Sequence, residues 1–163
     1  MQAHKLQQQT GALHVDVVVS SPLTRALQTA SIAFAPQLTD GSIPAISLEG
    51  CRERFGKQNP DARRRTSEFA AHFPRFDMRR LARADALHGE VRETLAELSI
   101  RAAAFVPELL ALPHRHVAVV SHSGFLAALF NVAADCSDAP ELAGWFDTAE
   151  MRAVHLEPIR SGT

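Results

Sequence analysis

The chain has 163 residues, of which 46% are hydrophobic and 21% charged, and its formal net charge is −1. This length and composition suit one globular domain and exclude a disordered, highly charged polymer. The near-neutral charge predicts no binding to nucleic acid or to an anionic membrane surface, and no apolar run is long enough to span a bilayer.

The start of the sequence predicts a helix, a strand and a second helix. Residues 1–11 are polar and predict a helix, and residues 15–19 form a short β-branched run that is typical of a buried strand. Ser21 and Pro22 then predict an N-cap and a first helical residue. Because residues 23–34 continue with apolar side chains at helical spacing, this part predicts a strand, a tight turn and a helix.

The middle of the chain predicts less regular structure. Residues 36–42 suit a loop, and residues 43–48 suit a second short strand. Residues 49–65 are polar and contain five arginines. A short helix is expected over residues 66–73, with Thr66 as its N-cap.

The last part of the chain alternates helices with strands. Apolar residues recur at three- and four-residue steps from about residue 90 to 112, which predicts an amphipathic helix that Pro113 ends. Residues 117–120 predict a buried strand, residues 125–134 an apolar helix, and residues 151–156 a last strand. Strands that alternate with helices predict an α/β domain with a mostly parallel sheet.

Two strand–turn–helix units, residues 17–30 and 117–129, carry the polar residues of most interest. In open parallel sheets, the carboxyl ends of the strands lie at one edge, where ligands bind. Helix N-termini at that edge present free N–H groups and a positive dipole to an anion. Arg25 lies in the first unit and His122 in the second. These residues predict a phosphate site, with a solvated arginine and a structural histidine as the alternative interpretation.

The cysteines and a histidine pair point to no metal or disulfide framework. Cys51 and Cys136 lie far apart, which predicts two free thiols in a reducing compartment. His114 and His116 form a His-x-His pair that leads into a strand, but no third ligand is evident close by in the sequence. Metal ligation by this pair stays open, and a pair of surface residues is the favoured interpretation.

Three ordered segments, SSPLTRALQTA, CRERFG and VAVVSHSGF, resemble the histidine phosphatase superfamily, also called the phosphoglycerate mutase-like family. The resemblance extends from about residue 2 to residue 156. It is similar to the small plant and fungal members, including an Asp-x-Arg-Arg sequence at residues 61–64. It implies a three-layer α/β/α sandwich with a mostly parallel sheet, formed by a single domain over residues 1–163.

The resemblance also implies roles for individual residues. Arg25 would clamp the phosphoryl oxygens, His122 would hold and neutralise the transferring group, and the backbone N–H of Ser123 would donate to the same oxygens. Glu53 would act as the general acid at the leaving oxygen, with Glu49 as the alternative. Phosphoryl transfer of this kind needs positioning and charge neutralisation, so no metal or other cofactor is expected.

The chain departs from the family at its N-terminus. It contains no Arg-His-Gly, the motif whose histidine attacks phosphorus in the family. The pattern begins within a helix, so we expect an incomplete domain that lacks its first strand and its nucleophile and leaves neighbouring strands with unpaired edges. The complete protein is expected to be a phosphoester hydrolase that forms phosphohistidine, whereas residues 1–163 alone are expected to be inactive. The alternatives are a non-catalytic protein that binds phosphate or a phosphorylated ligand, and a phosphoglycerate mutase.

Residues 57–90 correspond to the segment that covers the mouth of the pocket in relatives. Arg63 and Arg64 in this segment are expected to bind substrate, with a solvated loop as an equally weighted alternative. The expected partner is a small phosphorylated substrate, and neither nucleic acid nor a membrane. Homodimers are common among relatives, and the sequence does not decide between a monomer and a dimer. The N-terminal residues lack the apolar core of a signal peptide, which favours the cytoplasm.

Overall fold

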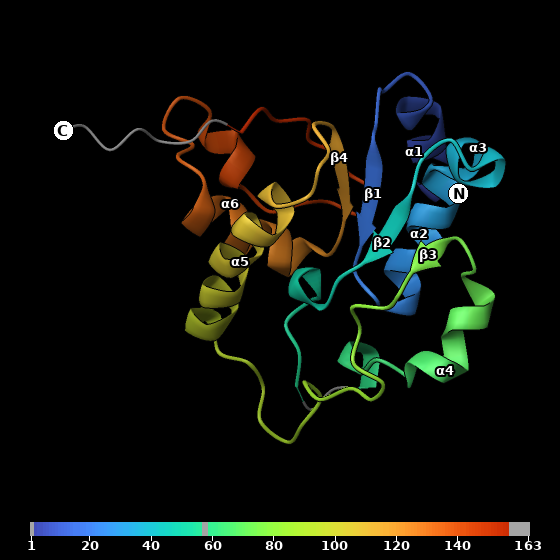
Figure 1. Ribbon diagram of the computed structural model, residues 1–163. Coiled ribbons are helices and arrows are strands. Elements are labelled where there is room, and N and C mark those ends of the chain that lie inside the picture. The colour runs from blue at the N-terminus through green and yellow to red at the C-terminus, as the bar shows by residue number, and fades with distance from the viewer. Residues whose placement is uncertain (1, 57–58, 157–163) are drawn as a thin grey trace.

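The sheet of the computed structural model, which describes residues 2–56 and 59–156, contains four short strands within those residues. The strands are β1 (Val17–Ser20), β2 (Ala45–Ser47), β3 (Phe76–Asp77) and β4 (Val117–Val120). They lie in the order β3-β2-β1-β4 (Figure 1). Each pair of neighbours is parallel, which confirms the mostly parallel sheet that the sequence predicts. Only β3 is not predicted, because two residues are too few to show the alternation of a strand.

β1 is a central strand of the sheet. All four of its residues are buried, since β2 pairs along one edge and β4 along the other. β4 is the last strand on its side of the described sheet, and its four apolar residues are only half-buried. Within the described strands, β4 therefore presents an unpaired apolar edge, whereas β1 is paired on both sides.

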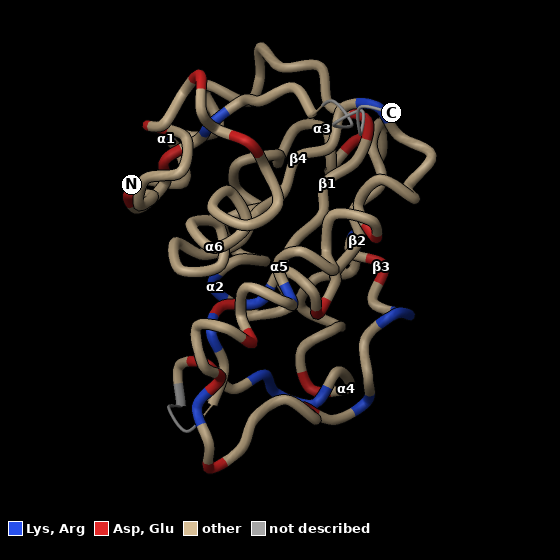
Figure 2. The backbone as a smooth tube through the Cα atoms, turned by 90° about the vertical axis from the view of Figure 1, so that its left-hand side faces the viewer, with Lys and Arg blue, Asp and Glu red and all other residues tan. Residues whose placement is uncertain are grey.

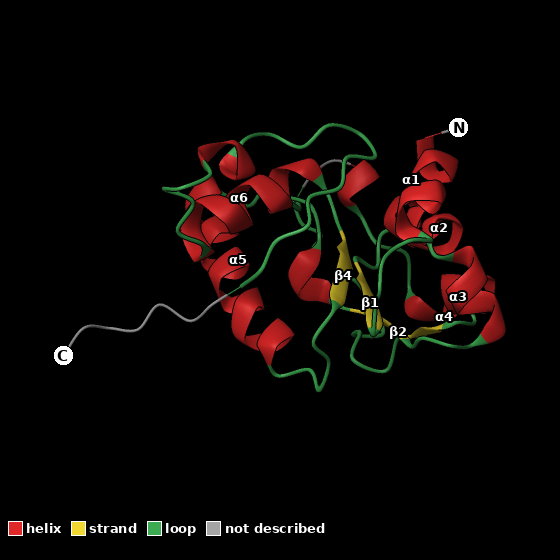
Figure 3. Ribbon diagram, turned by 90° about the horizontal axis from the view of Figure 1, so that it is seen from above, coloured by secondary structure: helices red, strands yellow, loops and turns green. Residues whose placement is uncertain are grey.

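Helices cover both faces of the sheet and give the three layers that the resemblance implies (Figure 3). Val18 packs into the core on one face, and Val17 and Val19 pack into the core on the other, because successive side chains of a strand alternate. The first core is covered by α1 (Gln2–Thr10), α2 (Thr24–Ala33), α3 (Ala35–Asp40) and α4 (Thr66–Phe69). The second is covered by α5 (Leu95–Leu110) and α6 (Ser123–Ala133). Short 3-10 turns are η1 (Glu49–Cys51), η2 (Asn59–Asp61), η3 (Ala70–His72) and η4 (Pro140–Ala143).

Charged residues of both signs are interleaved along the segments around α4 (Figure 2). Some of them form ion pairs, such as Arg63 with Glu49 and Arg79 with Asp77, each at 2.7 Å. Part of the arginine-rich middle of the chain therefore serves contacts within the fold. None of the helices in the described part of the chain is both long and apolar enough to cross a bilayer.

Two predictions of secondary structure are wrong. The predicted loop at residues 36–42 is largely helical, because Pro36 lies in the first turn of α3, where the fixed φ of proline suits a helix. Gly41 ends this helix with a φ of +74°, which glycine adopts without strain. The strand predicted at residues 151–156 does not form. Arg152 in this segment donates instead to the carbonyls of Leu142, Gly144 and Trp145, which ties it to the preceding loop.

Two predicted N-caps are also wrong. Leu23 rather than Ser21 is the N-cap of α2, because the backbone stays extended up to Leu23, with φ −71° and ψ 133°. Arg65 rather than Thr66 is the N-cap of α4. The Thr66 hydroxyl donates instead to the carbonyl of Ala82 at 2.9 Å. The side chains of Ser21 and Thr66 thus contact residues outside the helices that they are predicted to cap, His122 and Ala82 respectively.

The N-terminus of α5 carries a capping box. The Thr94 hydroxyl accepts from the N–H of Glu97 at 3.2 Å, and the Glu97 carboxylate accepts from the N–H of Thr94 at 2.7 Å. Replacing Thr94 with alanine removes one of these bonds and should lower the free energy of unfolding by about 1 kcal/mol. Urea denaturation measures this loss, and Thr39→Ala at an exposed threonine of α3 is the control. Equal stability of the two variants would show that the cap contributes nothing.

Candidate functional site

The site begins where β1 and β4 end. These strands lie side by side and parallel, with Ser20 paired to Val120. Ser21 follows β1 and donates its backbone N–H to the carbonyl of Val120 at 3.0 Å. α2 and α6 begin shortly after the two strands, so their N-termini lie at the same edge of the sheet. The two units identified in the sequence therefore converge at one edge.

His122 stands at the centre of this edge and contacts both units. Its Nδ1 accepts a hydrogen bond from Nε of Arg25 at 3.2 Å, and its Nε2 lies 2.8 Å from the hydroxyl oxygen of Ser21. Because a guanidinium group only donates, Nδ1 must be unprotonated. The neutral ring therefore carries its proton on Nε2 and donates it to Ser21. The sequence did not single out Ser21 as a contact of His122.

Burial keeps His122 uncharged. His122 is 7% exposed, and its burial is the largest of several effects that together lower the pKa of the imidazole from 6.5 to about 3. The positive charges of Arg25, Arg52 and Arg101 contribute the rest of this lowering. An anion bound beside the ring would oppose these effects and raise the pKa. The arrangement thus suits uptake of a proton together with an anionic ligand.

The lowered pKa of His122 predicts that the protein loses stability in mild acid. Between about pH 6.5 and pH 3 the unfolded chain binds a proton at this residue that the folded chain does not, so stability falls as the pH falls. From pH 7 to pH 5 the expected loss is about 2 kcal/mol. Urea denaturation at both pH values measures it, and His122→Gln should remove most of the slope. A slope that persists in this variant would assign it to other groups.

Two guanidinium groups lie at the mouth of the site. Arg25 is exposed and donates from Nη1 to the carbonyl of Pro60 at 2.5 Å. Arg64 is also exposed and donates to the hydroxyl of Thr24, the first residue of α2, at 3.4 Å. Through these contacts the segment expected to cover the pocket touches it, although residues 57 and 58 of that segment lie outside the described residues. Arg64 and Arg25 therefore offer two cations near the N-terminus of α2.

Arg63, in contrast, is not brought to the pocket. It is 5% exposed, and its guanidinium forms an ion pair with Glu49 at 2.7 Å. The same group donates to the carbonyls of Ala82 and Ala84 at 2.9 and 3.0 Å. These contacts all come from one terminal nitrogen, and the other donates to the carbonyl of Arg64 and the hydroxyl of Thr66, each at 3.0 Å. Both terminal nitrogens of Arg63 are thus engaged inside the fold.

The two candidate general acids, Glu49 and Glu53, differ in the groups that contact their carboxylates. The Glu49 carboxylate lies 3.2 Å from Arg52 and 2.7 Å from Arg63, so two buried cations already engage it. The Glu53 carboxylate instead accepts backbone N–H groups, from Arg54 at 2.9 Å and from Gly124 at 3.3 Å. Since Gly124 lies two residues after His122, this geometry favours Glu53 as the acid beside the pocket.

The first turn of α6 completes the site. Ser123 is the first residue of this helix and His122 its N-cap, without a side-chain cap bond. The hydroxyl of Ser123 donates to the carbonyl of Phe146 at 2.8 Å, and its backbone N–H, as that of a first helical residue, has no acceptor within α6. The N–H of Gly124 in this turn already donates to Glu53, and the dipole at this end of the 11-residue helix favours an anion.

A buried network that the sequence did not reveal supports the segment that carries Glu53. Arg101 of α5 donates to the carbonyls of Gly50 and Arg52 at 2.9 and 2.8 Å and forms an ion pair with Glu93 at 2.7 Å. Arg52 is fully buried and holds Asp85 through two hydrogen bonds of 2.7 and 3.0 Å. These contacts hold in place the backbone of the segment that carries Glu53.

Comparison with known sequences agrees with the motifs. The model of the histidine phosphatase superfamily (branch 1) matches residues 1–158. Phosphoglycerate mutase-like protein 1 of Arabidopsis thaliana is 31% identical over 169 aligned residues, which cover 86% of this chain and 60% of the relative. A second phosphoglycerate mutase-like protein of Arabidopsis thaliana is 29% identical, with 62% of its length covered. The chain thus spans about 60% of the length of the curated relatives it matches.

Solved structures share the fold at low sequence identity. The α-ribazole phosphatase from Shigella flexneri superposes with a TM-score of 0.59 and 18% identity, over 91% of this chain and 71% of that one. The mycobacterial glucosyl-3-phosphoglycerate phosphatase superposes with a TM-score of 0.53 and 20% identity, over 91% of this chain and 73% of that one. At this identity the likeness extends to the arrangement of the sheet and its helices.

Proposed function

Because the chain belongs to the histidine phosphatase superfamily, we propose that its pocket binds the phosphoryl group of a small phosphorylated substrate. In its complete form the protein acts as a phosphoester hydrolase with a phosphohistidine intermediate. The observation that carries this proposal is the hydrogen-bonded set of Ser21, Arg25 and His122 between two helix N-termini. Positive groups that converge on one edge of a parallel sheet fit a phosphate dianion.

Each pocket residue has a distinct task in this proposal. Arg25 holds the phosphoryl oxygens through its guanidinium fork, and Arg64 adds a second cation at the mouth. His122 takes up a proton when the anion binds and neutralises the charge that spreads over the equatorial oxygens. The N–H of Ser123 donates to the same oxygens from the start of α6.

The proposed reaction has two steps, transfer of the phosphoryl group to a histidine and hydrolysis of the phosphohistidine. A histidine nitrogen attacks phosphorus, the bond from phosphorus to the leaving oxygen breaks, and Glu53 gives its proton to that oxygen. The oxygen of a water molecule then bonds to phosphorus, the Glu53 carboxylate takes a proton from that water, and the phosphorus–nitrogen bond breaks, which releases inorganic phosphate and restores the histidine. The attacking histidine of the family belongs to an Arg-His-Gly sequence, which residues 1–163 do not contain. The proposal therefore assigns the nucleophile to a segment outside these residues.

For residues 1–163 by themselves, a second candidate function follows from the same observation. The pocket side chains are in contact without a nucleophile of the family type, so this chain binds phosphate or a phosphorylated ligand without turning it over. Transfer of the phosphoryl group to a second hydroxyl, as in a mutase, remains the alternative outcome for the complete protein.

Paired measurements of binding and turnover test the proposal. Residues 1–163 should bind inorganic phosphate in calorimetry and should hydrolyse p-nitrophenyl phosphate no faster than the Arg25→Ala variant. The extended protein, in which a segment carrying Arg-His-Gly precedes residue 1, should hydrolyse it and should lose this activity with His122→Ala. Arg75→Ala, at an exposed arginine that contacts the carbonyl of Thr39, is the matched control. His122-dependent turnover by residues 1–163 would contradict the proposal, because it would make His122 the nucleophile.

A further inference from the structure

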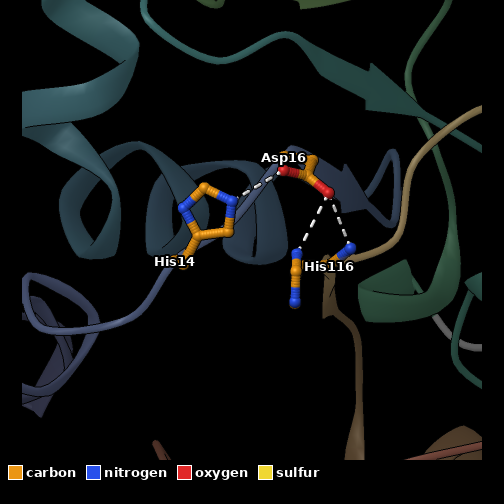
Figure 4. A group of neighbouring side chains, drawn as sticks. All are labelled: His14, Asp16 and His116. Atoms are coloured by element: carbon orange, nitrogen blue, oxygen red, sulfur yellow. Dashed lines mark hydrogen bonds and ion pairs between the residues drawn. The ribbon is translucent and has the colours of Figure 1, made fainter.

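A group of three metal-ligating side chains lies at the end of the strands opposite the phosphate pocket. His14 and Asp16 precede β1, and His116 precedes β4. Figure 4 shows both imidazole rings turned toward the Asp16 carboxylate. Nε2 of His14 lies 3.1 Å from one carboxylate oxygen, and Nδ1 of His116 lies 3.2 Å from the other. One ligand atom from each residue falls within 4.8 Å of the others.

The fold holds the central ligand of this group in place. One oxygen of Asp16 accepts the backbone N–H groups of Arg115 and His116 at 3.0 and 2.8 Å. The N–H of Asp16 in turn donates to the carbonyl of His116 at 2.8 Å. Hydrogen bonds of this kind orient a ligating carboxylate before a cation arrives. The other oxygen faces His14 and is not engaged by these amides.

We propose that His14, Asp16 and His116 form a binding site for a divalent transition-metal ion of the zinc class. Two imidazole nitrogens and one carboxylate oxygen suit zinc, whereas magnesium and calcium prefer oxygen ligands alone. A fourth position filled by water completes a tetrahedral ion, since the two histidine side chains are 77% and 56% exposed and solvent reaches the group. This site is separate from the pocket and does not rest on the proposed function.

The distances between the donor atoms fit such an ion. Ligand atoms around tetrahedral zinc lie roughly 3.3 Å apart when the bonds are about 2.0–2.1 Å long. Each histidine lies near this distance from a different oxygen of Asp16, His14 at 3.1 Å from one and His116 at 3.2 Å from the other. The rings of His14 and His116 are 4.8 Å apart between centroids, and rotation of the exposed His14 side chain brings the two nitrogens closer. The His-x-His pair in the sequence contributes His116, while both other ligands come from the segment that leads into β1.

A bound ion would connect the segments that lead into β1 and β4. These strands start side by side, with Val17 paired to Val117 directly after the ligands. Because the unfolded chain does not hold the three groups together, the ion binds the folded state and stabilises it. The ion would therefore hold the start of β4, the last strand on its side of the described sheet, against the start of β1.

Metal binding to the chain without a polyhistidine tag tests this proposal. Equilibrium dialysis against Zn²⁺ followed by elemental analysis should find one ion per chain, and the melting temperature should rise with the Zn²⁺ concentration. Co²⁺ in place of Zn²⁺ should give the visible absorption of a tetrahedral site. His14→Ala and His116→Ala should each weaken binding by at least ~10-fold, the loss that even outer-shell changes cause. An excess of Mg²⁺ should not displace the ion.

His88→Ala provides the matched control, because His88 is an exposed histidine outside the cluster. This variant should bind Zn²⁺ like the unaltered chain. Absence of stoichiometric Zn²⁺ would overturn the proposal and leave a hydrogen-bonded surface cluster only. Unchanged affinity in both His14→Ala and His116→Ala would overturn it as well, because the ion would then bind elsewhere. His14 is exposed, so its variant is expected to fold and the comparison stays decisive.

Discussion

Replacing Asp85 with alanine is expected to lower the free energy of unfolding by about 3–5 kcal/mol. Asp85 holds Arg52 through two hydrogen bonds, and the side chains of Arg52 and Asp85 are 0% and 8% exposed. Burial by itself raises the pKa of Asp85, but the hydrogen bond from Arg52 and the N–H of Arg63 outweigh it and lower the pKa to about 2. Without the carboxylate, Arg52 is left as a buried cation with only one carboxylate at 3.2 Å, that of Glu49.

Asp77→Ala is a matched control for this prediction. Asp77 also contacts an arginine through both oxygens, but its partner Arg79 is 90% exposed. Water replaces the lost contact there, so the loss of stability should be much smaller. Urea denaturation of the two variants gives the comparison. Similar losses would mean that burial of the Arg52–Asp85 pair does not determine its contribution. Asp85→Asn, which keeps the shape and one acceptor, should lie between the two.

The convergence of Arg25 and His122 follows from sequence pattern alone. Residues 17–20 and 117–120 are short apolar runs, each followed by polar turn residues and an apolar helix. Parallel strands place such turns at one edge, whichever helices lie between them. The neighbourhood of β1 and β4 is enough to bring Arg25 within 3.2 Å of His122. Features that follow from the parallel direction of the strands, such as the shared edge of these two turns, can therefore be predicted from the sequence.

The role of individual arginines was not predictable in the same way. Arg63 and Arg64 are adjacent in sequence, yet the first is buried in a network of carbonyls and the second faces the pocket mouth. That difference depends on Glu49 and on the path of residues 82–84, which have no periodic pattern. Asp85 escaped prediction for the same reason, since it meets Arg52 across 33 residues of chain. Contacts between irregular segments produce no periodic pattern in the sequence, so the sequence does not predict which residues meet.

A third example is the candidate metal site formed by His14, Asp16 and His116, which the sequence predicts only in part. The sequence shows a His-x-His pattern at His114 and His116, with no third ligand close by along the chain. Asp16 lies 100 residues from His116, and both Asp16 and His14 precede β1, which pairs with β4. Only the order of the strands reveals them, because a parallel pair brings together the starts of two strands as well as their ends.

Gly124→Ala is expected to reduce turnover of the extended protein by about 10²–10⁴-fold, as much as removal of the general acid itself. A Cβ atom at position 124 would lie 2.5 Å from one carboxylate oxygen of Glu53 and 3.2 Å from its carboxyl carbon. The Glu53 side chain would have to move, and with it the hydrogen bond from the N–H of Gly124. Its proton would then no longer be delivered to the leaving oxygen, so kcat should fall more than KM rises.

A double-mutant cycle distinguishes this mechanism from general damage to the helix. If Gly124→Ala acts through Glu53, then Glu53→Gln and the double variant should have nearly equal activity, because the acid is lost in both. Gly89→Ala is the control, since a Cβ there meets no atom within 4 Å and its turnover should be unchanged. Additive losses in the double variant would instead show that Gly124 matters for the N–H groups of α6. Gly124 contributes an N–H group to α6 and also contacts the Glu53 carboxylate. The cycle measures which of these two contributions the reaction uses.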